Sequence, residues 1–302
     1  TYASGHIQNA IADGFVLEGS SAASNANNSD YIAWCWKAGG VPSGNNKRRT
    51  DDSSSETPLT AVSNTATGTA TTYGFSSATD LSNVKQSVNT AGDFSITTYD
   101  SGGSTNNQHL CHGLSGKPDF VIWKNYEDDG KSWVVWHSSL EDTNGFLTLD
   151  TDAAEVDGTT VIGPNANFTN TSVVLGSNGR TSGSGKFVMY AWKAVDGVSA
   201  FGGYTGTGAG NSFTDIEFPG GGFQPRFIMI KRTSSTEHWV IHDVARGVTE
   251  RIYPDGANTG QNDTGTQLYY PTFTSEGFTY PTTVGDAVWN GDGSTYIYAA
   301  FA

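Results

Sequence analysis

The chain has 302 residues and a formal net charge of −14 at pH 7, with 15% charged and 12% aromatic residues. Binding to a phosphate backbone needs concentrated Lys and Arg, so this acidic composition argues against nucleic acid as a partner. No apolar run approaches the roughly 18 residues that span a bilayer, so we also expect no membrane span. Aromatic residues together with 38 Gly and many Ser, Thr and Asn favour an all-β fold.

The first predicted strand is YIAWCWKAGG at residues 31–40, which is apolar on both faces and ends at a glycine pair. We interpret it as a core closing strand that buries Trp34 and Trp36, with a shorter strand beginning at Gly14-Phe15. Residues 1–40 are then the closing strands of an incomplete first unit. Of the two cysteines, Cys35 falls in this strand and Cys111 far downstream; we expect two free, buried thiols.

Residues 41–90 read as a connector, because residues 41–72 are rich in Ser, Thr, Gly and Asn and have scarcely an aromatic. The one helical pattern lies at its end, at 80–89, where the apolar spacing fits one helical face. The alternative for this short stretch is an extended linker.

The remaining chain consists of repeats. KFVMYAWKAVDG at 186–197 and STYIYAAFA at 294–302 repeat the opening strand. GKPDFVIWKN and KSWVVWHSSL, in the first half, are answered by FQPRFIMIKR and EHWVIHDVAR in the second. Two units of about 105 residues follow, 91–197 and 198–302, a length typical of whole domains. We expect tandem antiparallel β-sandwich domains, of jelly-roll or concanavalin-like type. Aromatic residues at repeated positions are the expected structural core: Trp34, Trp36, Trp133, Trp192, Trp239 and Phe301.

Several motifs occur along the chain in a fixed order that can be compared with that of known families. DFSITTY is followed by His112-Gly113-Leu114, then Lys117-Pro118 and FVIWKN. The second unit has VSAFGGYTGTG, a Gly-Phe-Gln-Pro segment, FIMIKR and the aromatic ending at 296–302. In these motifs the chain resembles an uncharacterised repeat domain near the C-termini of tail-fibre-like and other virion proteins of marine bacteriophages, including cyanophages and pelagiphages.

This resemblance implies a location at the virion surface, or extracellular, with other virion proteins as partners. Because the chain opens midway through a unit, we expect the missing strands of that unit to come from a partner chain or from preceding sequence. The expected assembly is therefore a homo-oligomer.

The residue patterns offer little support for a catalytic site or a metal site. A glycosidase needs two carboxylates flanking a sugar cleft, and the available acids cluster in turns, where they are usually solvated: Glu127, Asp128, Asp129, Glu141 and Asp142. His109, Cys111 and His112 lack a fourth ligand at zinc spacing, so we interpret them as a strand-end cluster. We expect a protein without catalytic activity or cofactor. If a metal binds, Asp128 and Asp129 are the calcium candidates.

Sugar binding is the main alternative, because Trp and Tyr stack on sugar rings. Trp133 and Trp239 occupy equivalent repeat positions, which favours a core role. Trp289 and Tyr126 lack such equivalents and lie near turns, so they are our candidates for ligand or partner contact, together with Asp128.

The sequence therefore predicts a non-enzymatic virion structural protein: a tail fibre or appendage, a knob, or a capsid decoration that assembles through strand edges and aromatic faces. Two alternatives stay open. One is an adhesin that binds a host surface glycan, and the other is an extracellular filament or surface-layer subunit.

Overall fold

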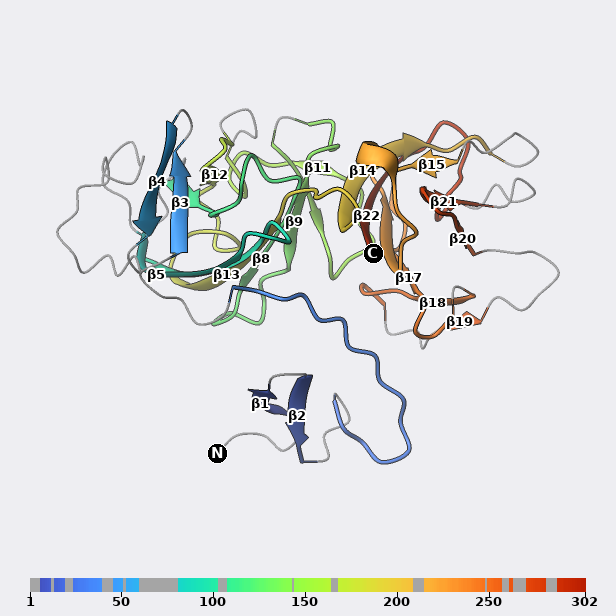
Figure 1. The fold of residues 1–302 in the computed structure, drawn as a ribbon, viewed down its shortest axis with the longest axis horizontal. Coiled ribbons are helices and arrows are strands. Elements are labelled where there is room, and N and C mark those ends of the chain that lie inside the picture. Colours follow the sequence, from blue (N-terminus) through green and yellow to red (C-terminus); the bar gives the residue numbers. More distant parts are fainter. Residues whose placement is uncertain are drawn as a thin grey trace. The chain divides into compact units, whose positions relative to one another are not determined.

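The computed structural model (Figure 1) divides into two compact units, Thr1–Trp36 and Lys37–Ala302. The residues that the structure describes are 6–11, 14–19, 24–39, 46–50, 53–59, 81–102, 108–142, 144–163, 168–208, 215–247, 249–256, 261–262, 270–280 and 287–302. Within these ranges, no helix is long and apolar enough to cross a membrane. Antiparallel strands dominate both units, which confirms the all-β class.

The first unit contains one hairpin, β1 (His6–Ile11) with β2 (Gly14–Glu18). The prediction of a closing strand at 31–40 is wrong, because the described residues 31–39 form no strand. Trp34 is only half-buried and Trp36 is 37% exposed, so Trp36 is not a core residue as expected. A strand is stabilised by ladder hydrogen bonds to neighbours, and these residues pair with none of the described strands. Both cysteines are free, as expected, but Cys35 is exposed.

The second unit opens with a hairpin of β3 (Asn46–Thr50) and β4 (Ser53–Leu59). Residues 80–89, where we weighed a helix against a linker, instead form β5 (Leu81–Asn89), which pairs with the next strand, β6 (Phe94–Ser101). At its centre Lys85 is exposed between the buried Val84 and Gln86, so neighbouring side chains there point to opposite faces, as in a strand. The predicted connector therefore contains three strands.

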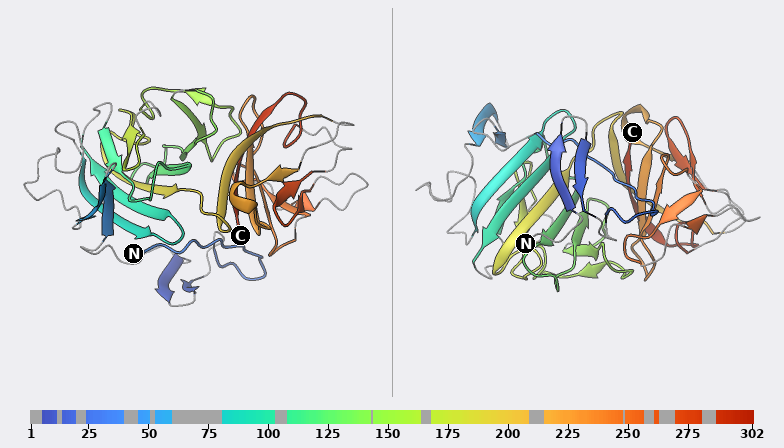
Figure 2. Two further views of the ribbon diagram at one scale, coloured as in Figure 1. Left: turned by 45° about the horizontal axis from the view of Figure 1, so that its top comes forward. Right: turned by 90° about the horizontal axis from the view of Figure 1, so that it is seen from below.

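The first sheet has seven strands in the order β11-β10-β9-β8-β13-β6-β5. Its remaining strands are β8 (Phe120–Asn125), β9 (Val134–His137), β10 (Gly145–Thr148), β11 (Val156–Asp157) and β13 (Gly185–Trp192). Figure 2 shows these strands side by side. A second layer of β7 (Gln108–Cys111) and β12 (Ser172–Leu175) contributes buried Leu110 and Val173. One face of the sheet is thus fully covered, as in a sandwich.

The second sheet has six strands in the order β14-β22-β16-β17-β18-β19. Their bounds are β14 (Ser199–Thr205), β16 (Phe227–Arg232), β17 (Val240–Asp243), β18 (Glu250–Ile252), β19 (Gln261–Asn262) and β22 (Thr295–Phe301). Five strands follow the order of the first sheet, in which β6, β13, β8, β9 and β10 are neighbours. The register also agrees: Phe120 pairs with Trp192 and His137, and Phe227 pairs with Phe301 and Asp243.

A three-stranded layer covers one face of this second sheet. It consists of β15 (Ile216–Glu217), β20 (Thr272–Phe273) and β21 (Gly277–Thr279), with a short 3-10 helix η3 (Pro219–Gly221). Phe218, Phe278 and Tyr280 from this layer pack against Ile228 and Tyr298 of the sheet in one hydrophobic core. The two layers form a second sandwich.

Trp289 lies in this core and is fully buried. Its ring stacks on Tyr280, with centroids 5.3 Å apart and an interplanar angle of 5°. The expectation that Trp289 is a surface contact residue is therefore wrong. A position near a glycine-rich turn suggested exposure, but the turn folds back onto the core, where Tyr204 donates a hydrogen bond to the Trp289 carbonyl.

Candidate functional site

The candidate site of the second unit is the contact between the two sheets, which we call the seam. In the second sheet, Ile228, Ile230 and Val240 point into its own sandwich core. Because side chains alternate along a strand, Met229, Lys231 and their neighbours point to the opposite face. This outer face of the second sheet is covered by the first half of the unit, chiefly by residues 138–155, which follow β9.

Aromatic rings form one end of the seam. The Phe120 and Phe201 rings stack with centroids 5.6 Å apart, and the Trp192 and Phe301 rings meet edge to face at 6.3 Å. Phe201 and Phe301 in turn contact each other at 5.7 Å. Rings arranged in this way contribute beyond their buried area, so this cluster stabilises the contact between the sheets.

His137 links the end of β9 to the centre of the second sheet. The amide of Ser139 donates to His137 Nδ1 at 3.0 Å, so Nδ1 is an acceptor and the proton sits on Nε2. His137 Nε2 then donates to the Tyr298 carbonyl at 3.0 Å. Burial lowers the pKa of His137 to about 4, although the bond to the Tyr298 carbonyl acts in the opposite direction. The neutral imidazole is therefore the form that holds the seam.

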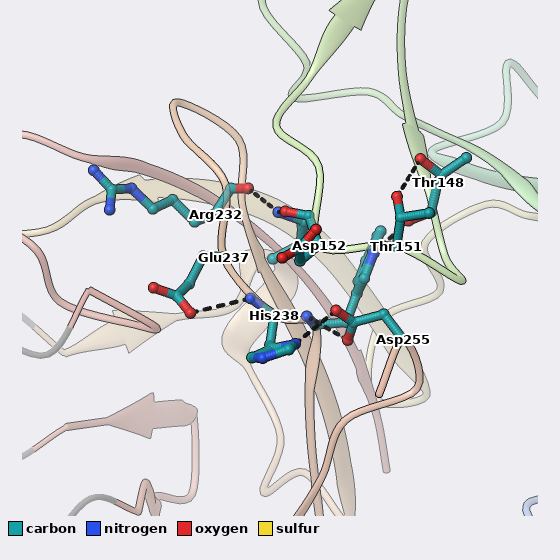
Figure 3. A network of polar contacts seen from close by, with 9 residues as sticks. Thr148, Thr151, Asp152, Arg232, Glu237, His238 and Asp255 are labelled. Carbon is teal, nitrogen blue, oxygen red and sulfur yellow. Dashed lines mark hydrogen bonds and ion pairs between the residues drawn. The ribbon is translucent and has the colours of Figure 1, made fainter. Parts of the chain in front are cut away.

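Trp239 is the second polar anchor of the seam. It is fully buried, and its indole Nε1 donates to the Thr148 carbonyl at 2.8 Å. Next to it, the Asp255 carboxylate accepts from the Trp239 amide at 3.1 Å and lies 2.8 Å from His238 Nδ1. Figure 3 shows Thr148 and Asp255 with the neighbouring His238.

Lys231 is the third anchor and is completely buried. Its ammonium group donates to the Asp152 carbonyl at 3.2 Å and to the Arg232 carbonyl at 2.7 Å. Burial lowers the pKa of Lys231 to about 8, against the attraction of the Asp255, Glu237 and Asp152 carboxylates. Burying a lysine ammonium is costly unless it is hydrogen-bonded, and these two carbonyls are its acceptors.

Backbone hydrogen bonds complete the seam. The Glu155 amide donates to the Thr233 carbonyl and the Glu237 amide donates to the Asp152 carbonyl, each at 2.9 Å. Gly203 allows the closest approach, since a Cβ built on it lies 3.1 Å from the Cβ of Ser139. The segment 138–155 therefore contacts the second sheet near both of its ends, at Ser139 and at Asp152, and Figure 3 shows the Asp152 end.

The predicted acidic candidates hold turns. The Glu155 carboxylate accepts from the amides of Glu141 and Asp142, and Glu127 forms an ion pair with Lys186. Asp128 accepts from the Gly130 amide at 2.9 Å and lies 3.6 Å from Lys131 Nζ. Glu141 and Asp142 thus lie in the segment that covers the second sheet, where Glu155 holds their turn, whereas Glu127 and Asp128 contact Lys186 and Lys131.

The cluster at 109–112 is also structural. His112 accepts from the Leu114 amide at Nδ1 and lies 3.3 Å from the Thr169 carbonyl at Nε2, and burial lowers its pKa to about 4. His109 Nδ1 lies 3.1 Å from the Ser172 hydroxyl. Over the described ranges, no three His, Cys, Asp or Glu side chains gather as a metal-ion site.

The expected core residues divide into two groups. Trp192 and Trp239 are buried, whereas Trp133 and Phe301 are half-buried. Trp133 stacks on Tyr190, with centroids 6.5 Å apart, on the partly exposed face of the first sheet. Tyr126, at the end of the same face, is 50% exposed. Its amide donates to the Lys186 carbonyl, as the Thr233 amide donates to the Thr295 carbonyl in the second sheet.

Sequence comparison of the two units missed the aspartates of the seam. Asp150 accepts from the Trp133 amide at 3.1 Å, just as Asp255 accepts from the Trp239 amide at 3.1 Å. The signal was present: an aspartate follows the tryptophan by 17 residues in one unit and by 16 in the other. It was hidden because the residues around the two aspartates differ.

Residues 74–302 match a family model described as a domain of unknown function, DUF7483. The match includes β5 to β22, and thus both sheets and the seam between them. No curated protein and no solved structure matches the chain. The chain belongs to the DUF7483 family.

Proposed function

We propose that the chain is a non-enzymatic structural protein at the surface of a marine bacteriophage particle, in a tail fibre or appendage, a knob or a capsid decoration. It assembles there as a homo-oligomer with other virion proteins. The virion part of this proposal rests on the motifs quoted above. The structural part rests on the seam, in which one β-sandwich covers the sheet of the next with aromatic rings and carbonyl acceptors.

The seam favours a structural role because its polar groups are used for rigidity. His137, Trp239 and Lys231 each donate to a backbone carbonyl of a facing segment. Carbonyl acceptors fix geometry without providing a nucleophile or a general base. A buried, hydrogen-bonded contact of this kind suits a particle that must resist mechanical and solvent stress.

A second candidate is an adhesin that binds a host surface glycan. The supporting observation is the row of rings Trp133, Tyr190 and Trp192, stacked at successive centroid distances of 6.5 and 6.3 Å. Trp133 and Tyr190 are half-buried, so their rings retain accessible area on which sugars can stack.

Immunogold electron microscopy of the source particle, with an antibody against residues 81–302, tests the proposal. Regular labelling of a tail or capsid surface supports it, and purified particles that lack the chain contradict it. A glycan array with the recombinant chain tests the second candidate. Binding that Trp133→Ala abolishes would favour the adhesin.

A further inference from the structure

The two sheets present the same residue types at the positions that form the seam. Trp133 directly precedes β9, whose Val134 pairs with Trp123, and Trp239 directly precedes β17, whose Val240 pairs with Ile230. Lys124 and Lys231 follow those paired residues on β8 and β16. Trp133 and Lys124 of the first sheet therefore stand where Trp239 and Lys231 stand in the second.

Only one of these two positions is covered. Trp239 Nε1 donates to the Thr148 carbonyl, whereas Trp133 Nε1 has no hydrogen-bond partner among the described residues. Lys231 is fully buried under residue 152, whereas Lys124 is half-buried and donates to the nearby Lys131 carbonyl.

We call the partly exposed side of the first sheet the open face. Strand pairing brings its residues together: Val188 pairs with Thr98 and Lys124, and Tyr190 pairs with Ile96. All five are half-buried, whereas the alternate residues are buried. Together with Trp133, these residues give an apolar patch that contains Lys124, bordered by charged residues of the same face: Lys85, which pairs with Thr98, and the pair Lys186 and Asp100.

The far end of the chain has a counterpart to the segment that covers the second sheet. The bonds from the tryptophan amides make Asp255 equivalent to Asp150, so the turn Tyr253–Gly256 corresponds to residues 148–151. Ser139 reaches Gly203 in the seam, and the position equivalent to Ser139 is Ala245. Ala245 is exposed, and its neighbour Val244 is 48% exposed.

We propose that the open face binds a second copy of this chain, which presents residues 244–245 and the turn Tyr253–Gly256 as residues 138–151 are presented within the chain. Ala245 of the second copy then lies over Thr98, the position equivalent to Gly203. The contact joins two different surfaces, so it repeats head to tail and produces a ring or a filament. This inference rests on the proposed function and specifies how the homo-oligomer forms.

A protein partner fits the open face better than a sugar. The equivalent face in the same chain is used for protein, and the indole N–H and the lysine there both meet backbone carbonyls. A face built with the same donors has the same preference. A sugar would need acceptors and donors in planes around the rings, and the neighbours of Tyr190 across the sheet are Ile96 and Ile122.

Sedimentation velocity over a concentration series tests the inference with the full chain and two variants. Thr98→Arg places a charge on the open face, and Ala245→Arg places one on the opposing surface. The control is Thr272→Arg, an equal charge change at an exposed position in the three-stranded layer. Thermal unfolding of each variant shows that it is folded.

We expect the wild type and the control to form assemblies beyond the dimer, and each of the other variants alone to stay monomeric. An equimolar mixture of Thr98→Arg and Ala245→Arg has one intact contact, so it forms a dimer and stops there. Trp133→Phe, which removes the N–H and part of the ring area while keeping an aromatic side chain, should weaken association at least about tenfold.

Four results overturn the inference. Assembly that Thr98→Arg leaves unchanged shows that another surface is used, although the structural function survives. Dimers of each variant alone show a symmetric contact. If the wild type is monomeric, and residues 1–36 are more sensitive to protease in the Thr98→Arg variant than in the wild type, the chain covers its own open face. A wild type that is monomeric throughout and absent from the particle contradicts the proposed function as well.

Discussion

The indole Nε1 of Trp239 donates a hydrogen bond to the Thr148 carbonyl at 2.8 Å, across 91 residues of sequence and between two sandwiches. Trp133, at the equivalent position in the first sheet, has no such bond among the described residues. Exposure also separates the two residues, because Trp239 is fully buried within the chain, whereas Trp133 is half-buried on the open face.

Trp239→Phe replaces the indole by a smaller phenyl ring, so the Thr148 carbonyl loses its donor and the buried site loses packing. We expect the free energy of unfolding to fall by about 2 kcal/mol, from one buried hydrogen bond and the cavity left by the smaller ring. Trp133→Phe is the matched control and should change the stability of the isolated chain by less than about 0.5 kcal/mol. Urea unfolding at low protein concentration measures both, and equal losses in the two variants would show that the seam bond is not special.

Lys231 should make stability rise in alkaline solution. Its pKa is about 8 in the folded chain and 10.5 in its ordinary state. Between these values the unfolded chain holds the proton and the folded chain does not, so unfolding becomes more costly as the pH rises. The full effect is about 3 kcal/mol.

The Lys231→Met variant cannot titrate in this range. We therefore expect its free energy of unfolding to rise less than that of the wild type between pH 8 and pH 10. Comparing the two proteins by urea unfolding cancels the contribution of the buried tyrosines, which titrate higher. A variant that keeps the full alkaline rise would show that Lys231 is not the group responsible.

His137 should make the chain sensitive to acid. Its folded pKa of about 4 is below the ordinary 6.5, so the stability that it contributes is present above pH 6.5 and is lost as the pH falls towards 4. His112 has the same shift, so two histidines share the acid-dependent loss. Each accounts for about 3 kcal/mol at most.

His137→Gln retains a side-chain N–H for the Tyr298 carbonyl but cannot titrate. We expect it to remove about half of the histidine-dependent loss of stability between pH 6.5 and pH 4, and His112→Gln to remove the other half. Unfolding curves of the two single variants and the double variant measure this. If the double variant still loses as much stability as the wild type between pH 6.5 and pH 4, the loss is due to carboxylates.

The sequence was sufficient for the strands whose partners are near or repeated. FVMYAW and YIYAAF were both predicted as core strands, and each lies between two neighbours in its sheet. The same pattern at residues 31–36 led to a wrong prediction of a strand, because an apolar segment forms a strand only where it can pair with the edge of a sheet. Residues 80–89 misled in the opposite way, since four apolar or long side chains fit a helical face and a strand equally well at that length.

The seam was beyond prediction for a different reason. Its bonds join Thr148, Asp152 and Tyr298 through their backbone carbonyls, and a carbonyl leaves no residue-type signature in a sequence. The lysine pair Lys124 and Lys231 was visible as a repeat. Whether each lysine is buried in a contact depends on which of the two sheet faces is covered, and only the fold determines that.

The net charge of −14 makes assembly sensitive to salt. Copies of an acidic chain repel one another, and added salt screens this repulsion over about 10 Å at 0.1 M. We expect sedimentation velocity to show stronger self-association at 0.5 M NaCl than at 0.05 M NaCl. Weaker association at high salt would mean that ion pairs, rather than an apolar face with carbonyl acceptors, hold the contact.

The most direct test is a cross-link from the open face. A photoreactive amino acid at position 98, in a mixture of isotopically light and heavy chains, marks what lies over the face in solution, and mass spectrometry distinguishes links between chains from links within one chain. We predict mixed-isotope links from position 98 to peptides that contain residues 244–256. Links confined to single chains, or mixed links to other peptides, would contradict the proposed head-to-tail contact.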